Sequence, residues 1–136
     1  MPQTLASRNH HWGGTALRML ASVAGVLIGL WWAFRRVEID GGSMRPSLQP
    51  GDRVLLRRRM VVPIRAGSIV GFDDPRGGGT FMIKRVLDAG SEGIDVRGDN
   101  QAASTDSRHF GLLKPTAVRW VMVRRYHKAT ASLPED

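Results

Sequence analysis

The chain has 136 residues and no cysteine, so a disulfide framework and a thiolate metal site are both excluded. Its formal net charge is +8, from 20 basic and 12 acidic side chains, which favours an anionic partner such as membrane lipid. Nucleic acid is not expected as a partner, because we find neither exposed aromatics nor a recognisable reading element. Residues 1–16 are mostly polar and predict a mobile N-terminal tail.

An apolar segment follows this tail. Residues 19–34 contain no charged side chain and are flanked by arginine on both sides. At about 1.5 Å per residue they span roughly 24 Å, slightly less than a ~30 Å hydrocarbon core, and Arg18 can extend the span by snorkelling. Trp31 and Trp32 are typical interfacial aromatics. We predict a transmembrane anchor over residues 17–36. A cleaved signal peptide, disfavoured by the bulky end of the segment, and a buried soluble helix are the alternatives.

The pattern then changes to short β-like runs separated by glycine- and proline-containing turns. The expected strands are Val37–Asp40, Arg53–Arg59, Ser68–Asp73, Thr80–Leu87, Ile94–Arg97 and Ala117–Val123. This spacing predicts a mainly β fold, as a small antiparallel sheet or barrel-like domain over residues 37–128. Residues 129–136 are expected to form a C-terminal tail.

Ser43 is a candidate nucleophile. It follows two glycines, which permit a tight turn and the close approach of another backbone. A serine needs a base within hydrogen-bond reach before it can attack a carbonyl. The four histidines lie in no convincing setting at a strand end: His10, His11, His109 and His127.

Lys84 is the candidate base, since Ser-Lys pairs are a known variant of the catalytic triad. It lies in an apolar run, and only three of the 20 basic residues are lysines. A buried lysine can lose its proton, whereas arginine cannot. The neighbouring Arg85 would face the other side of the strand and need a carboxylate, from Asp99 or Asp106. The alternative is that Ser43 is an ordinary turn serine and Lys84 an exposed lysine on an edge strand.

These residues belong to a series of motifs. The series consists of Ser43–Asp52, Lys84–Val86, Gly98–Asn100 and Ser104–Arg108. In order and content it closely resembles the type I signal peptidases, the S26 family of Ser-Lys serine endopeptidases. The resemblance covers about residues 41–111, and the N-terminal anchor also fits.

The resemblance implies a role for each matching residue. Ser43 would be the nucleophile and Lys84 the general base. The implied supporting residues are Ser104, which orients the lysine; Arg85 and Asp99, an ion pair beneath the site; Asp106 and Arg108, which hold the site loop; and Met44, which lines the substrate pocket. No metal or cofactor is implied.

The implied reaction removes an N-terminal signal or pro-segment from a precursor protein through an acyl-enzyme. Family members cut after small side chains at positions −1 and −3. Three positions depart from the family pattern: Ser47 replaces the usual Thr, Ser68 replaces a common Asp, and Gly41 lacks the hydroxyl that some members direct at the oxyanion. Hydrogen bonds from the Ser43 N–H and from an unidentified second donor would then stabilise the oxyanion.

The spacing of the motifs suggests a subgroup. Thirteen residues separate Lys84 from Gly98, where larger members insert a whole β domain. This minimal core resembles small bacterial maturation proteases, including those for nickel-type superoxide dismutase, and the mitochondrial inner-membrane peptidases. Residues 104–111 and 123–126 most resemble the superoxide dismutase group, whose precursor would then be the partner.

The family places its catalytic domain outside the cytoplasm on a single-pass anchor in the cell membrane. The flanking arginines slightly favour the opposite orientation, and we give more weight to the family. Two other functions fit parts of the chain. One is a non-catalytic, membrane-tethered β adaptor. The other is a repressor-type self-cleaving Ser-Lys protease, although such relatives carry a DNA-binding helical domain in place of an anchor.

Overall fold

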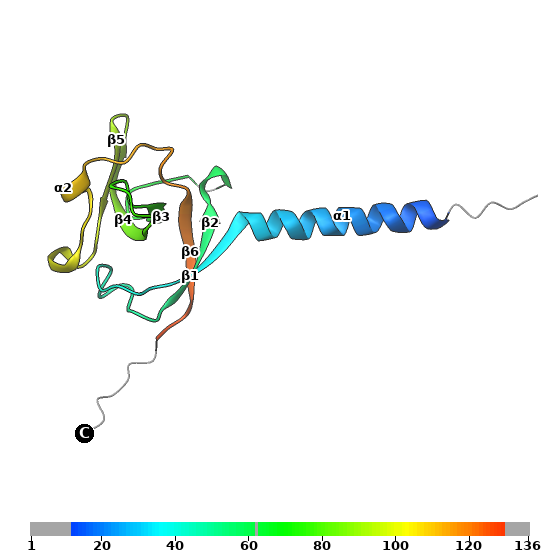
Figure 1. Cartoon of the computed structure of the whole chain (residues 1–136), viewed down its shortest axis with the longest axis horizontal. Coiled ribbons are helices and arrows are strands. Elements are labelled where there is room, and N and C mark those ends of the chain that lie inside the picture. Colours follow the sequence, from blue (N-terminus) through cyan, green and yellow to red (C-terminus); the bar gives the residue numbers. More distant parts are fainter. Residues whose placement is uncertain (1–11, 62, 130–136) are drawn as a thin grey trace, which may run out of the picture. The chain divides into compact units, whose positions relative to one another are not determined.

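The computed structural model describes residues 12–61 and 63–129, and it contains two compact units (Figure 1). The first is a long helix, and the second, from Ala33 onward, contains the strands. Residues 1–11 of the N-terminal tail predicted at 1–16, and residues 130–136 of the predicted C-terminal tail, lie outside the described residues.

Helix α1 (Trp12–Ala33) is long and apolar enough to span a membrane. The 20 residues Gly14–Ala33 have a mean hydropathy of 1.6, and at about 1.5 Å per residue they match a ~30 Å hydrocarbon core. None of the side chains from residue 14 to residue 32 is buried within the chain. The alternative of a buried soluble helix therefore does not fit.

The helix begins and ends earlier than the predicted anchor at 17–36. Residues 12–16 are helical rather than part of a tail, since the two glycines near this end weaken a helix without breaking it. At the other end, Phe34–Glu38 forms strand β1, because these residues pair with Arg53–Arg57 of the next strand. Tertiary pairing, which local hydropathy does not reveal, decides this boundary.

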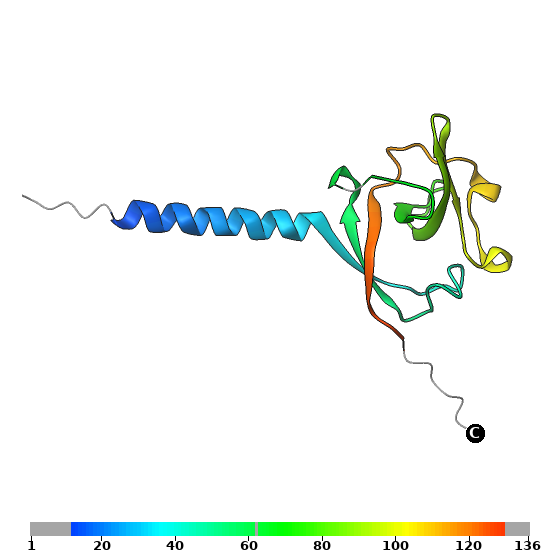
Figure 2. The same ribbon diagram turned by 180° about the vertical axis from the view of Figure 1, so that it is seen from behind.

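The second unit is a six-stranded antiparallel sheet with the order β1-β2-β6-β3-β4-β5, and Figure 2 shows it from behind. The mainly β antiparallel fold predicted from the sequence is confirmed. The strands after β1 are β2 (Arg53–Arg58), β3 (Ile69–Asp73), β4 (Phe81–Gly90), β5 (Gly93–Arg97) and β6 (Trp120–His127). The short helices are η1 (Arg59–Val61), η2 (Gln101–Ala103) and α2 (Ser107–Phe110).

Strand β6 differs most from its predicted position. It begins at Trp120 and ends at His127, whereas the apolar pattern predicted Ala117–Val123. Ala117 instead belongs to a turn, in which its N–H donates to the Lys114 carbonyl at 2.9 Å. Pairing with β2 extends the strand through a polar stretch that carries no apolar signal.

The sheet separates two apolar clusters, because side chains alternate along each strand. On β4, Met82 and Val86 pack in one cluster, whereas Phe81 and Ile83 pack in the other. The second cluster lies beneath the loop between β1 and β2, which carries Ser43. The core thus fixes β4 and this loop next to each other.

Candidate active site

The loop that presents Ser43 is held by buried apolar side chains. Met44 and Leu48 are each 2% exposed, and the Leu48 N–H donates to the Met44 carbonyl at 2.9 Å. The Gly42 carbonyl accepts from the Arg45 N–H at 3.2 Å and closes the preceding turn. Because its neighbours on both sides are anchored, the half-buried Ser43 side chain has a defined position.

Lys84 lies on β4, and its ammonium reaches this loop. Lys84 is only 4% exposed. Its Nζ lies 2.7 Å from the Ser43 Oγ and donates a hydrogen bond to it. Burial lowers the pKa of Lys84, and the negative charge of Asp106 only partly opposes this shift. Lys84 is therefore not the exposed edge lysine of the alternative interpretation.

Arg85 and Asp99 form a bidentate ion pair. The Arg85 Nε and Nη2 donate to the Asp99 Oδ1 and Oδ2 at 2.8 and 2.7 Å. Of the two carboxylates considered for Arg85, its partner is thus Asp99. Nη2 also donates to the Ser47 Oγ at 3.3 Å, so the serine found where the family usually has threonine keeps a hydroxyl contact. The pair connects β4 both to the loop after β5 and to the Ser43 loop.

Asp106 connects several segments around the site. Its buried carboxylate accepts from the Gly98 N–H at 3.0 Å, the Ser104 hydroxyl at 2.8 Å and the Arg108 Nε at 2.9 Å, and it caps helix α2. Burial alone would raise its pKa. Hydrogen bonds from Arg108, Gly98 and Ser104 outweigh burial and hold the pKa far below the usual range. A permanent negative charge therefore organises the loop from residue 98 to residue 108.

Ser104 differs from the role that the family resemblance implied. In the part of the chain that the structure describes, its hydroxyl donates to Asp106 and makes no hydrogen bond to Lys84. The stronger acceptor is the ionised carboxylate, which explains this choice. Ser104 thus contacts Asp106, whose negative charge in turn acts on Lys84.

Two residues near Ser43 were quoted in the motif series but were given no role. The Asn100 N–H donates to the Ser43 carbonyl at 2.9 Å, and its side-chain amide donates to the Gly42 carbonyl at 3.3 Å. A Cβ on Gly98 would lie 2.2 Å from the Ser104 Oγ and 2.7 Å from the Ser43 carbonyl oxygen. Glycine at position 98 thus permits the close approach of two loops, and Asn100 joins them.

A cavity of about 460 Å³ opens beside Ser43 and Lys84. Its remaining lining comes from β1 and its continuation, from Met44, and from the start of β4: Arg35, Val37, Glu38, Ile39, Asp40, Gly41, Met44, Thr80, Phe81, Met82 and Ile83. Met44 therefore lies at the wall of this groove, as well as in the core. The groove places the Ser43 hydroxyl and the Lys84 amine beside apolar side chains, as is typical of sites that bind a ligand.

The sequence profile of the family described as "Signal peptidase, peptidase S26" matches residues 12–98, which include α1, Ser43 and Lys84. The chain belongs to this family. A search of curated proteins found no match. The family match supports a signal-peptidase-like serine protease, and it ends before Ser104, Asp106 and Arg108.

The short interval between Lys84 and Gly98 has a simple structural basis. Strands β4 and β5 form a hairpin in which Gly90 pairs with Gly93, and this hairpin uses the whole interval between Lys84 and Gly98. The interval therefore holds one tight turn and no additional domain. Lys84 and Gly98 both lie at the open end of this hairpin, next to the pair formed by Arg85 and Arg97.

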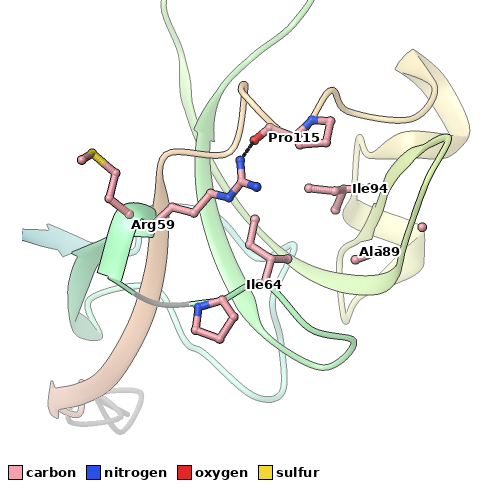
Figure 3. Close-up of a pocket in the computed structure, with 8 residues that line it drawn as sticks. Arg59, Ile64, Ala89, Ile94 and Pro115 are labelled. Atoms are coloured by element: carbon pink, nitrogen blue, oxygen red, sulfur yellow. Dashed lines mark hydrogen bonds between the residues drawn. The ribbon is translucent and has the colours of Figure 1, made fainter.

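A second cavity, of about 640 Å³, is larger than the groove beside Ser43 (Figure 3). Arg59, Ile64, Ala89, Ile94 and Pro115 are among its lining residues, and the Arg59 guanidinium donates to the Pro115 carbonyl. None of the site residues predicted from the S26 resemblance lines it. Cavity size alone would therefore indicate a different region from the one that the motif series indicates.

The histidines that are described do not contribute to the groove. His109 belongs to the capping box of α2, and His127 is exposed at the end of β6. Among residues 12–61 and 63–129, no group of three His, Asp or Glu side chains is placed to hold a metal ion. His10 and His11 lie outside the described residues.

Proposed function

We propose that this S26 member is a membrane-anchored serine endopeptidase that uses Ser43 and Lys84 as a catalytic dyad. The observation that carries the proposal is the 2.7 Å contact between Nζ and Oγ, made by a buried lysine at the wall of a groove. Burial favours the neutral amine, which is the form that can accept the serine proton.

The reaction follows from this contact. Lys84 in its neutral form accepts the proton of Ser43 while the Oγ attacks the peptide carbonyl carbon. The resulting ammonium returns this proton to the leaving amine, the C–N bond breaks, and an ester to Ser43 remains. Water then attacks the ester with Lys84 again as the base, and the released serine regains its proton.

The oxyanion formed in each attack needs hydrogen-bond donors. The Ser43 N–H has no acceptor among the residues that the structure describes, so it is available for this purpose. Gly41 has no side chain and therefore supplies no hydroxyl. A Cβ at Gly41 would meet nothing within 4 Å, so a hydroxyl-bearing residue would fit there.

A peptide in extended form fits the groove, because two strand edges without partners border it. Strand β1 is an edge of the sheet, and Phe81–Lys84 of β4 pairs only with β3 within the described residues. Extended peptides bind such edges through main-chain hydrogen bonds. This geometry supports a precursor polypeptide as the substrate.

Helix α1 is the proposed single-pass anchor, with the β unit on the outer face of the cell membrane. The precursor of a nickel-type superoxide dismutase is the specific substrate suggested by the resemblance of residues 104–111 and 123–126, and it stays a prediction. A precursor with small residues at −1 and −3 is the broader expectation.

The test compares wild type, Ser43→Ala and Lys84→Arg, purified in detergent, on precursor peptides that include one from a nickel superoxide dismutase. Mass spectrometry locates the cuts and detects an acyl adduct on Ser43. We expect both variants to lose at least about 10³-fold in kcat/KM, because alanine has no nucleophilic hydroxyl and guanidinium cannot release its proton at working pH.

Ser91→Ala and Lys114→Arg are matched controls, since both positions are exposed. They should keep full activity. Equal cutting by wild type and the dyad variants would exclude the dyad. A wild type that cuts no member of a broad peptide library, with its thermal unfolding intact, would favour the non-catalytic adaptor.

A further inference from the structure

Arg35 places a cation at the wall of the groove. It lies two residues before Val37 on β1, so its side chain leaves the strand on the side that packs against the second apolar cluster. Its guanidinium carbon lies 4.2 Å from the centre of the Phe81 ring and 6.0 Å from that of Trp120. Stacking on aromatic rings holds such a group in a defined place.

This cation has no carboxylate partner within residues 12–61 and 63–129. Glu38, a nearby acid that also lines the groove, pairs instead with Arg53 at 3.0 Å. Asp40 lines the groove further along the chain, toward Ser43. The groove lining therefore includes a cation, Arg35, that forms no ion pair within these residues, and the carboxylate of Asp40.

We propose that Arg35 forms a specificity subsite that binds an acidic side chain of the substrate. The inference rests on the proposed peptidase function and deepens it, since the same groove holds the peptide. A guanidinium on a fixed platform suits a carboxylate, which it can bind through two parallel hydrogen bonds. Lysine would not satisfy the stacking and the bidentate geometry together.

The geometry also limits where the acidic residue lies. Phe81, which supports Arg35, precedes Lys84 by three residues on β4, or about 10 Å along a strand. A substrate strand beside β4 would cover the same distance in about three residues. The acidic side chain is therefore expected roughly three residues from the bond that is cut.

The test uses a proteome-derived peptide library and the full chain in detergent. Mass spectrometry identifies the cuts that wild type makes and that the Ser43→Ala variant does not make. At each position on both sides of these cuts, the residue frequencies are compared with those of the library. We expect Asp and Glu to be enriched at one position two to four residues from the cut. Synthetic peptides with Asp there should exceed their Asn counterparts about threefold to tenfold in kcat/KM.

Three variants decide whether Arg35 is responsible. Arg35→Gln should remove the preference, and Arg35→Glu should invert it toward Lys and Arg. Arg36→Glu makes the same change of charge on the opposite side of β1, at an exposed position that does not line the groove, and should keep the wild-type preference.

The outcomes separate this inference from the proposed function. Efficient cutting that depends on Ser43, without an acidic preference or with one unchanged by Arg35→Glu, would overturn the subsite alone. Complete absence of Ser43-dependent cutting would overturn the peptidase proposal and the subsite with it. Circular dichroism of each variant excludes loss of fold as the cause.

Discussion

At the scale of single residues, the protonation of Lys84 controls the proposed chemistry. Burial lowers its pKa, so the neutral amine forms at a lower pH than in a solvated lysine. Activity should be absent where Lys84 is protonated and should rise with pH through the lowered pKa. We expect the rise in kcat/KM to have its midpoint clearly below the ordinary lysine value of about 10.4.

The measurement is a pH–rate profile of kcat/KM on one cleaved peptide, with unfolding monitored at each pH. Lys114→Arg should leave the profile unchanged, because that lysine is exposed and distant in sequence from the dyad. A profile that rises only near 10.4 would show that the buried lysine is not the titrating base.

Part of the surroundings of Lys84 could be predicted from residue types, whereas the roles proposed for Ser43 and Lys84 come from the family resemblance. The scarcity of lysine and the apolar run around Lys84 indicated a buried lysine, and alternation along the strand separated Arg85 from it. The sequence left Asp99 and Asp106 open as partners of Arg85, because the choice depends on how two loops fold over β5. The ion pair with Asp99 frees Asp106 to bind Ser104 and Arg108.

At the scale of elements, the site depends on the contact between the Ser43 loop and the chain after β5. Gly98 is the point of closest approach, where a Cβ would overlap Ser104 and the Ser43 carbonyl. We expect Gly98→Ala to destabilise the protein by about 1–3 kcal/mol, as overpacking usually does, and to reduce kcat strongly by displacing Ser43. Thermal unfolding and peptide kinetics measure the two effects.

Gly41→Ala is the matched control for this prediction. Its Cβ would meet nothing within 4 Å, and no positive φ requires glycine at this position. It should therefore retain the stability of wild type. Equal stability and activity of the two alanine variants would show that the loops do not pack as closely as described.

The elements themselves followed from period-two patterns and turn residues, but their ends did not. Strand β1 includes residues that the hydropathy pattern had placed in the anchor. Strand β6 extends through arginines, at which no apolar pattern predicts a strand. In both cases pairing with β2 supplies the backbone hydrogen bonds. Such long-range pairing is not encoded in a local window of sequence.

At the scale of the whole molecule, α1 as a single membrane anchor would place the β unit, with Ser43 and Lys84, on one side of the membrane. The absence of cysteine makes a clean test available, since an introduced cysteine would be the only thiol in the chain. Met60 is 92% exposed in the β unit and does not line the Ser43 groove. Met60→Cys should therefore react with a maleimide without disturbing the fold.

We expect a membrane-impermeant maleimide to label Met60→Cys in intact cells, because the S26 family resemblance places the catalytic unit outside the cytoplasm. Ser7→Cys, which precedes α1 in the chain, should be labelled only after permeabilisation. The reverse pattern would place the active site in the cytoplasm, as the flanking arginines slightly favour, and the substrate would then be cut before export. Labelling of both positions in intact cells would show that α1 does not span the membrane.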